Sequence, residues 1–132
     1  MRYRSLGATG IEVSHLGLGG LFISSVGGPL EQAKAATEHA LALGVNYIDT
    51  APGYLDSEEA IGKMVGGRDD YVISTKFGGR PDPFDPRDPE GLRQSFETSL
   101  ELLKRDTVDI LFIHEPDRPR QYAWWPEFPK AE

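Results

Sequence analysis

The sequence contains no cysteine, which excludes disulfides, zinc–thiolate sites and thiol nucleophiles. Positive charge is too scarce for a nucleic-acid or anionic-membrane surface, because 21 acidic residues outnumber 14 basic ones and the net charge is −7. Long hydrophobic runs are also missing, since glycine and serine dilute the uncharged stretch 13–30 below the hydropathy of a membrane span. The first ten residues lack the apolar core of a signal peptide. We therefore expect a cytoplasmic protein that binds neither nucleic acid nor membrane.

The 132 residues are 39% hydrophobic, which is enough for the core of one domain. An N-terminal β-hairpin is predicted over 1–14. Short apolar runs predict four strands, over 15–20, 45–49, 71–76 and 108–114. Helical spacing and flanking glycines or prolines predict three helices, over 29–43, 57–65 and 89–105. From 115 to 132 the periodicity fails, and an irregular tail is expected there.

Local signals in the helices predict their ends and their buried faces. Pro29 suits a first helical turn, while Ser57 and Asp88 are predicted as the N-caps of the second and third helices. The third helix is expected to bury one apolar stripe, formed by Leu92, Phe96, Leu100 and Leu103.

Three successive strands are each predicted to end in an ionisable residue. These residues are Asp49, Lys76 and His114, and Tyr54 follows Asp49 in a loop that contains proline and glycine. Strands that alternate with helices form a parallel sheet, whose neighbouring strands lie about 4.8 Å apart and whose sites lie at the carboxyl ends. We therefore expect the four side chains to converge on one edge of the sheet.

Each of these residues also has a purely structural interpretation. Charged residues often end a strand because the chain is leaving the core, and a tyrosine in such a loop is commonly a packing residue. His15 and His39 fit a structural interpretation outright, as a strand-flanking residue and a helix-face residue. The convergence of four different groups, and not any single residue, favours a site.

The four groups together suit proton transfer to or from an oxygen atom. An ammonium group beside a phenol favours phenolate, and a carboxylate keeps that ammonium charged in spite of burial. An imidazole can then hydrogen-bond to the oxygen of a substrate carbonyl or alcohol. No side chain supplies a hydride, so a redox reaction here requires a cofactor.

Several motifs along the chain, up to about Trp125, resemble the aldo/keto reductase family. They include the Gly-rich run 16–20, the Asp-Thr-Ala-Pro-Gly-Tyr element 49–54, the strand end 74–76 and the apolar strand that closes on His114. The resemblance implies a (β/α)8 TIM barrel whose bottom is closed by a hairpin. It further implies hydride transfer between NADP(H), or less often NAD(H), and an aldehyde, ketone or sugar.

The same resemblance implies a role for each candidate residue. Tyr54 is expected to be the general acid and base, Lys76 the residue that tunes it, Asp49 the partner of Lys76, and His114 the group that orients the carbonyl. Gly19 and Gly20, with Asp49, are expected at the cofactor. No metal site is expected.

The chain is short for this fold, because a TIM barrel needs about 250 residues. We therefore expect an α/β half-barrel over 1–132 that carries the first four β/α strands and lacks the late-barrel adenosine-phosphate pocket. Weak NADP binding and self-association through open sheet edges are expected to follow. Two alternatives stay open, a catalytically inactive half-barrel for assembly or binding and a doubly wound module with helices on both faces. Against the doubly wound module, Phe22 replaces the third glycine of a phosphate-binding loop.

Overall fold

A computed structural model describes residues 1–80 and 83–116. An antiparallel hairpin comes first, made of β1 (Tyr3–Ser5) and β2 (Glu12–Ser14). Four parallel strands then form the main sheet, in the order β3 (Leu18–Gly19), β4 (Tyr47–Asp49), β5 (Val72–Phe77) and β6 (Ile110–Ile113). A 3₁₀ turn, η1 (Gly20–Phe22), follows β3, and the connecting helices are α1 (Leu30–Ala42), α2 (Ser57–Val65) and α3 (Pro89–Leu103).

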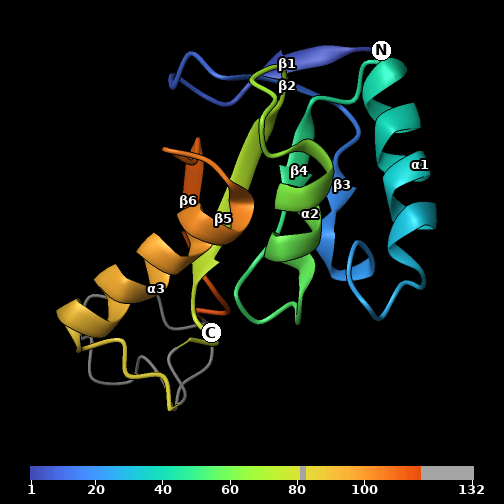
Figure 1. Cartoon of the computed structure of the whole chain (residues 1–132). Helices are drawn as coiled ribbons and strands as arrows, with labels where there is room; N and C mark the ends of the chain where they lie inside the picture. Colours follow the sequence, from blue (N-terminus) through green and yellow to red (C-terminus); the bar gives the residue numbers. More distant parts are fainter. Residues whose placement is uncertain (81–82, 117–132) are drawn as a thin grey trace.

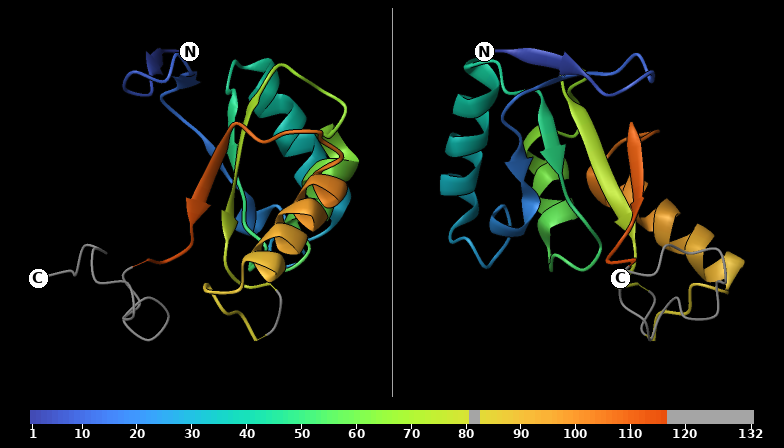
Figure 2. Two further views of the ribbon diagram at one scale, coloured as in Figure 1. Left: turned by 90° about the vertical axis from the view of Figure 1, so that its left-hand side faces the viewer. Right: turned by 180° about the vertical axis from the view of Figure 1, so that it is seen from behind.

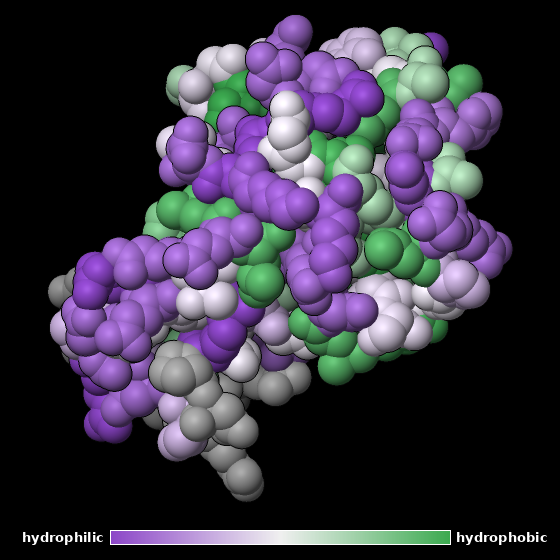
Figure 3. All heavy atoms as spheres, in the orientation of Figure 1, coloured by the Kyte–Doolittle hydropathy of each residue, from purple (hydrophilic) through white to green (hydrophobic). Residues whose placement is uncertain are grey.

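All three helices lie on the same side of the main sheet (Figure 2). The hairpin lies at the end of the sheet where the parallel strands begin, so the carboxyl ends of the strands form the opposite edge (Figure 1). A doubly wound module would carry helices on both faces of the sheet. Helices on one face only instead confirm the expected partial TIM barrel. The outward face of the helices is largely hydrophilic (Figure 3).

The core lies between the sheet and the helices. Ile48 and Ile73 come from the two central strands, Ile61 from α2 and Leu103 from α3, and all four are fully buried. Helices α2 and α3 approach so closely that a Cβ atom on Gly62 would lie 1.9 Å from the carbonyl oxygen of Leu102. Only glycine fits at that crossing.

The apolar stripe predicted for α3 is only partly buried in the described part of the chain. Of the predicted residues only Leu103 is fully buried, whereas Leu92, Phe96 and Leu100 are half-buried. The other buried positions of α3 carry small side chains, at Gly91, Ser95 and Ser99. Two of these small residues receive hydrogen bonds from Arg80, which donates to the Ser95 carbonyl and the Ser99 hydroxyl.

The predicted range of α2, 57–65, agrees with the structure, and so does the N-cap predicted for α3. The N-cap predicted for α2 was wrong, and Pro29 lies just before α1. The Asp88 carboxylate accepts a hydrogen bond from the Glu90 backbone N–H at 3.1 Å, as an N-cap does. Ser57 is instead the first residue of α2, and its hydroxyl is used elsewhere. Pro29 precedes α1 with ψ 139°, an extended conformation that places it outside the first turn.

The two outer strands, β3 and β6, each have one neighbour within the part of the chain that the structure describes. The apolar side chains of Leu111, Phe112 and Ile113 on β6 are 37–43% exposed. None of the described helices is both long enough and apolar enough to cross a membrane. The predicted tail lies outside the described residues from 117 onward, and Trp125 with it.

Candidate active site

The register of the parallel strands brings the predicted site residues to one edge. Asp49, the last residue of β4, pairs with Gly19 on one side and with Ser74 on the other. Lys76 lies near the end of β5. His114 directly follows β6, and its backbone N–H donates to the carbonyl oxygen of Phe77 at 2.9 Å. The carboxyl ends of β4, β5 and β6 therefore present a carboxylate, an ammonium and an imidazole side by side.

The Lys76 ammonium is held by three acceptors. Its Nζ lies 2.7 Å from each carboxylate oxygen of Asp49 and 2.8 Å from the carbonyl oxygen of Thr50. The side chains of Lys76 and Asp49 are 12% and 29% exposed, so the pair is largely shielded from water. An ammonium has three protons to donate. All three are satisfied here, so the position of the Lys76 side chain is fixed.

A chain of hydroxyl groups supports the Asp49 carboxylate from behind. The Ser74 hydroxyl donates to Asp49 Oδ1 at 2.7 Å. The Tyr47 hydroxyl lies 2.9 Å from the Ser74 oxygen, and it is the donor because the single Ser74 proton is already used. The carboxylate thus has a fixed orientation toward Lys76.

The Tyr54 ring lies between the ammonium and the imidazole. Lys76 Nζ is 4.8 Å from the centroid of the Tyr54 ring, within the range of a cation–π contact. The His114 ring meets the Tyr54 ring edge to face, with centroids 5.4 Å apart and an interplanar angle of 82°. Asp49, Tyr54, Lys76 and His114, here called the tetrad, therefore form one contiguous cluster, as the sequence analysis expected.

Glycines allow the backbone to pack tightly around His114. Gly78 has φ 128°, and a Cβ atom built on it would lie 2.9 Å from Cβ of His114. A Cβ atom on Gly53 would lie 3.6 Å from Cε1 of the same ring. The segment after β5 and the loop before Tyr54 therefore both pack against the His114 side chain.

The two glycines expected at the cofactor differ in their surroundings. Gly19 is exposed at the end of β3, and a Cβ atom on it would meet nothing within 4 Å. Gly20 is buried, and its carbonyl oxygen accepts a hydrogen bond from the Ser57 hydroxyl at 2.7 Å. Ser57 also bonds to the Thr50 hydroxyl at 2.8 Å, so these residues tie the start of α2 to the edge of the sheet. Of the two, Gly19 alone borders open space beside Asp49.

Asp56, just before α2, anchors the segment that follows η1. Its carboxylate accepts a hydrogen bond from the Ser25 backbone N–H at 2.7 Å. That bond to the ionised form holds the pKa of Asp56 below its ordinary value. Sequence reasoning missed this contact, because nothing in the pattern relates residue 25 to residue 56.

The sequence model of the Aldo/keto reductase family matches residues 15–125, which include the whole tetrad. The chain belongs to the aldo/keto reductase family. L-galactose dehydrogenase of Arabidopsis thaliana is 40% identical over 120 residues, a match that covers 85% of this chain and 37% of that protein. Aldo-keto reductase YhdN of Bacillus subtilis is 35% identical, with 89% and 39% covered.

A solved structure agrees with this assignment. The holo form of aldo-keto reductase AKR11C1 from Bacillus halodurans superposes with a TM-score of 0.65 at 31% identity, covering 84% of this chain and 37% of that one. This aldo/keto reductase chain thus spans less than half the length of the relatives it matches.

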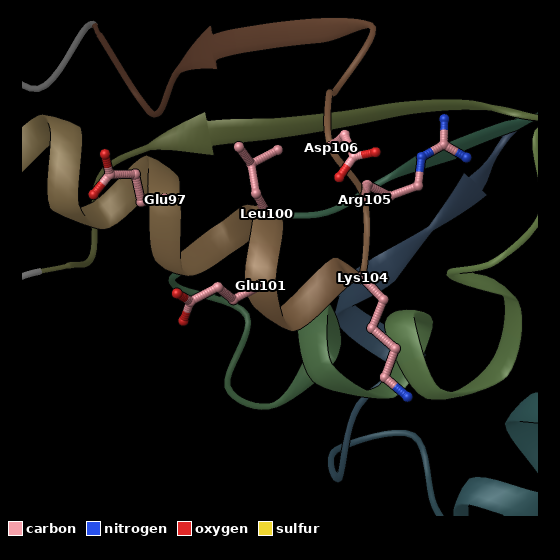
Figure 4. Close-up of a pocket in the computed structure, with 6 residues that line it drawn as sticks. All are labelled: Glu97, Leu100, Glu101, Lys104, Arg105 and Asp106. Atoms are coloured by element: carbon pink, nitrogen blue, oxygen red, sulfur yellow. The ribbon is translucent and has the colours of Figure 1, made fainter.

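A shallow hollow of about 500 Å³ lies away from the tetrad, at the end of α3 (Figure 4). It is lined by Glu97, Leu100, Glu101, Lys104, Arg105 and Asp106. No tetrad residue contributes to it. Over residues 1–80 and 83–116, no group of three or more histidines and carboxylates is arranged to hold a metal ion.

Proposed function

We propose that the tetrad supplies the proton transfer for a reaction in which hydride passes between NADP(H) and an aldehyde, a ketone or a sugar. One observation supports this proposal most strongly. The Lys76 ammonium is fixed between the Asp49 carboxylate, at 2.7 Å, and the ring of Tyr54, at 4.8 Å. A phenol beside an ammonium group is suited to proton transfer, because the positive charge favours the phenolate that forms when the proton leaves.

In the direction of reduction, Tyr54 is the proton donor. Its hydroxyl gives a proton to the substrate oxygen as the carbonyl carbon is reduced to an alcohol, and the phenolate then regains a proton from water. Lys76 stays in place throughout, because it donates to both oxygens of the Asp49 carboxylate and to the Thr50 carbonyl. His114, edge to face with Tyr54, is placed to hydrogen-bond to the same oxygen. The bound dinucleotide would supply the hydride.

The described residues fit the nicotinamide end of the dinucleotide better than its phosphates. Open space beside Gly19 and Asp49 suits a flat ring at the edge of the sheet. The phosphates need cations or free backbone N–H groups. Both cations near this part of β5 are already engaged, Lys76 with Asp49 and Arg80 with Glu58. We propose that the anionic part of the cofactor is held by the remainder of a full-length barrel.

Within this broad class we propose a sugar as the substrate. The relative at 40% identity is named for its action on L-galactose, and the match extends over the part of the chain that contains the tetrad. A proton relay at the oxygen of a sugar serves oxidation of a hydroxyl and reduction of a carbonyl equally well.

The experiment joins this chain to the remaining part of L-galactose dehydrogenase, giving a hybrid here called the completed barrel. NADP- and NAD-dependent turnover is measured with a series of aldoses and with small aldehydes that lack hydroxyl groups. The proposal predicts turnover that depends on Lys76 and favours sugars. A folded completed barrel that binds NADPH and turns over neither class of substrate would overturn it.

A second candidate function rests on a different observation. The exposed apolar side chains of β6, from Leu111 to Ile113, form an open edge of the kind that pairs with another strand. The 132 residues on their own therefore also suit a non-catalytic role as an assembly module.

A further inference from the structure

A buried ion pair lies behind the tetrad, on the helix side of the sheet. The Glu58 side chain is 3% exposed and the Arg80 side chain 27% exposed, and they meet at 2.8 Å. The other carboxylate oxygen of Glu58 accepts a hydrogen bond from the Thr75 hydroxyl at 2.6 Å. Arg80 also donates to the Ser99 hydroxyl at 2.7 Å and to the Ser95 carbonyl at 3.2 Å. One carboxylate and one guanidinium thus join α2, β5, α3 and the segment after β5.

Three residues of this network, Glu58, Thr75 and Arg80, are close in the chain to residues that form or contact the tetrad. Glu58 follows Tyr54 by one turn, and the Ser57 N–H donates to the Tyr54 carbonyl at 3.0 Å. Thr75 directly precedes Lys76 on β5. Arg80 comes two residues after Gly78, which packs on His114. Displacing the pair would therefore displace the supports of three tetrad residues together.

The segment between β5 and Arg80 depends on such an anchor. Gly78 and Gly79 have φ 128° and 87°, conformations that glycine adopts readily and that leave the segment little intrinsic stiffness. A Cβ atom on Gly79 would lie 2.9 Å from Gly53, so this segment also touches the loop that leads to Tyr54. Arg80 holds its far end through Nη2, whose two protons are shared among three acceptors, on Glu58, Ser95 and Ser99.

We propose that Glu58 and Arg80 are a positioning pair that sets the contact between His114 and Tyr54. Desolvation offsets much of the attraction in a buried ion pair, so such a pair is weak evidence for stability and suits a geometric role. The pair touches neither substrate nor cofactor and acts through Gly78 and the start of α2. This inference rests on the proposed function only for its consequence in catalysis, because the geometric effect is measurable without a reaction.

The test compares Arg80→Met with Arg80→Lys and Glu58→Gln in the 132-residue chain. Arg87→Met is the matched control, because Arg87 forms an exposed ion pair with Asp85 in the same connection between β5 and α3. Imidazole resonances are recorded by ¹H–¹⁵N NMR. His15 and His39 report on general disturbance in the same spectrum, and His114 reports on its contact with the Tyr54 ring.

We expect Arg80→Met and Glu58→Gln to shift the His114 resonances while those of His15 and His39 stay in place. Arg80→Lys should shift the His114 resonances less than Arg80→Met does, because lysine keeps a positive charge near Glu58. In the completed barrel the same variants should lower kcat by about 10²-fold, as misplacement of a reacting group by about 1 Å does, with KM changed much less. Arg87→Met should change neither the His114 resonances nor kcat.

An unchanged His114 resonance in folded Arg80→Met would overturn the proposal. If that variant does not fold, the same result in Arg80→Lys together with Glu58→Gln overturns it equally. Failure of the proposed reaction has a different signature. The completed barrel would then show no turnover, or Tyr54→Phe would leave its turnover intact, while the Arg80 variants would still move the His114 resonances.

Discussion

Replacing Lys76 with methionine keeps a long, unbranched side chain and removes its charge. The change deletes three hydrogen bonds and leaves the Asp49 carboxylate without its cation. Removing one partner of a buried ion pair costs about 3–5 kcal/mol. Asp49 is 29% exposed and keeps its bond from Ser74, so part of its charge stays solvated. We therefore expect a loss of about 2–3 kcal/mol in the free energy of unfolding, or roughly a 30- to 160-fold change in the unfolding equilibrium constant.

The matched control is Lys63→Met on the outer face of α2. Lys63 forms an ion pair with Glu59 one turn earlier, and their side chains are 51% and 48% exposed. Such an exposed pair is worth about 0.3–0.5 kcal/mol. Urea unfolding of the 132-residue chain, followed by circular dichroism, gives both free energies by linear extrapolation. If Lys76→Met costs no more than Lys63→Met, the ion pair at the edge of the sheet is not the buried, fully satisfied interaction described above.

Three further outcomes follow from the same structure. The Tyr71 hydroxyl is buried and makes no well-formed hydrogen bond in the described part of the chain. Arg105 lies 5.0 Å from the centre of its ring, and burial outweighs this nearby charge and raises the pKa of Tyr71. Tyr71→Phe should therefore stabilise the chain by about 1 kcal/mol at pH 7. The free energy of unfolding of Tyr71→Phe should also fall less than that of the wild type as pH rises above about 10, where the Tyr71 phenol ionises in the unfolded wild-type chain first. A steeper alkaline loss in the variant than in the wild type, measured by urea titrations, would contradict this. The wild-type chain should associate with rising concentration in analytical ultracentrifugation, and Phe112→Lys on the exposed β6 edge should weaken association; a sharp monomer throughout would refute the idea. NADPH should bind the 132-residue chain weakly, because the net charge of the chain is −7 and Lys76 is already paired with Asp49. Micromolar binding in a fluorescence titration would show that other residues form a phosphate pocket.

The fold and the place of the tetrad were predictable because both follow from local patterns. Alternating strands and helices require a parallel sheet, and the carboxyl ends of neighbouring strands lie together. That rule alone brings Asp49, Lys76 and His114 to one edge, as the register confirms. The half-barrel also follows from the resemblance to a barrel family, since alternation by itself does not say on which faces the helices lie.

Contacts between distant elements were not predictable, because no periodicity relates their residues. Ser57 has the residue type of an N-cap, but its hydroxyl bonds to Gly20 and Thr50 across the edge of the sheet. The Glu58–Arg80 pair was missed for the same reason, since a charged residue in a helix and another in a loop are most simply interpreted as solvent-exposed. Two small residues one turn apart in α3, Ser95 and Ser99, mark the place where Arg80 bonds to the helix, and a search for apolar stripes overlooks them.

If the Tyr54 hydroxyl is the proton donor, its removal slows hydride transfer. The single-turnover rate of hydride transfer in the completed barrel carrying Tyr54→Phe measures this effect. This substitution keeps the ring that contacts Lys76 and His114 and removes only the hydroxyl. Tyr3→Phe is the control, because it removes a hydroxyl that bonds to Gly44 on the hairpin side. General acid–base catalysis contributes about 10²–10⁴-fold to a rate. We therefore expect the single-turnover rate to fall by that factor in Tyr54→Phe, with NADPH binding unchanged. A rate above about one tenth of wild type would contradict it and leave Tyr54 as a packing residue.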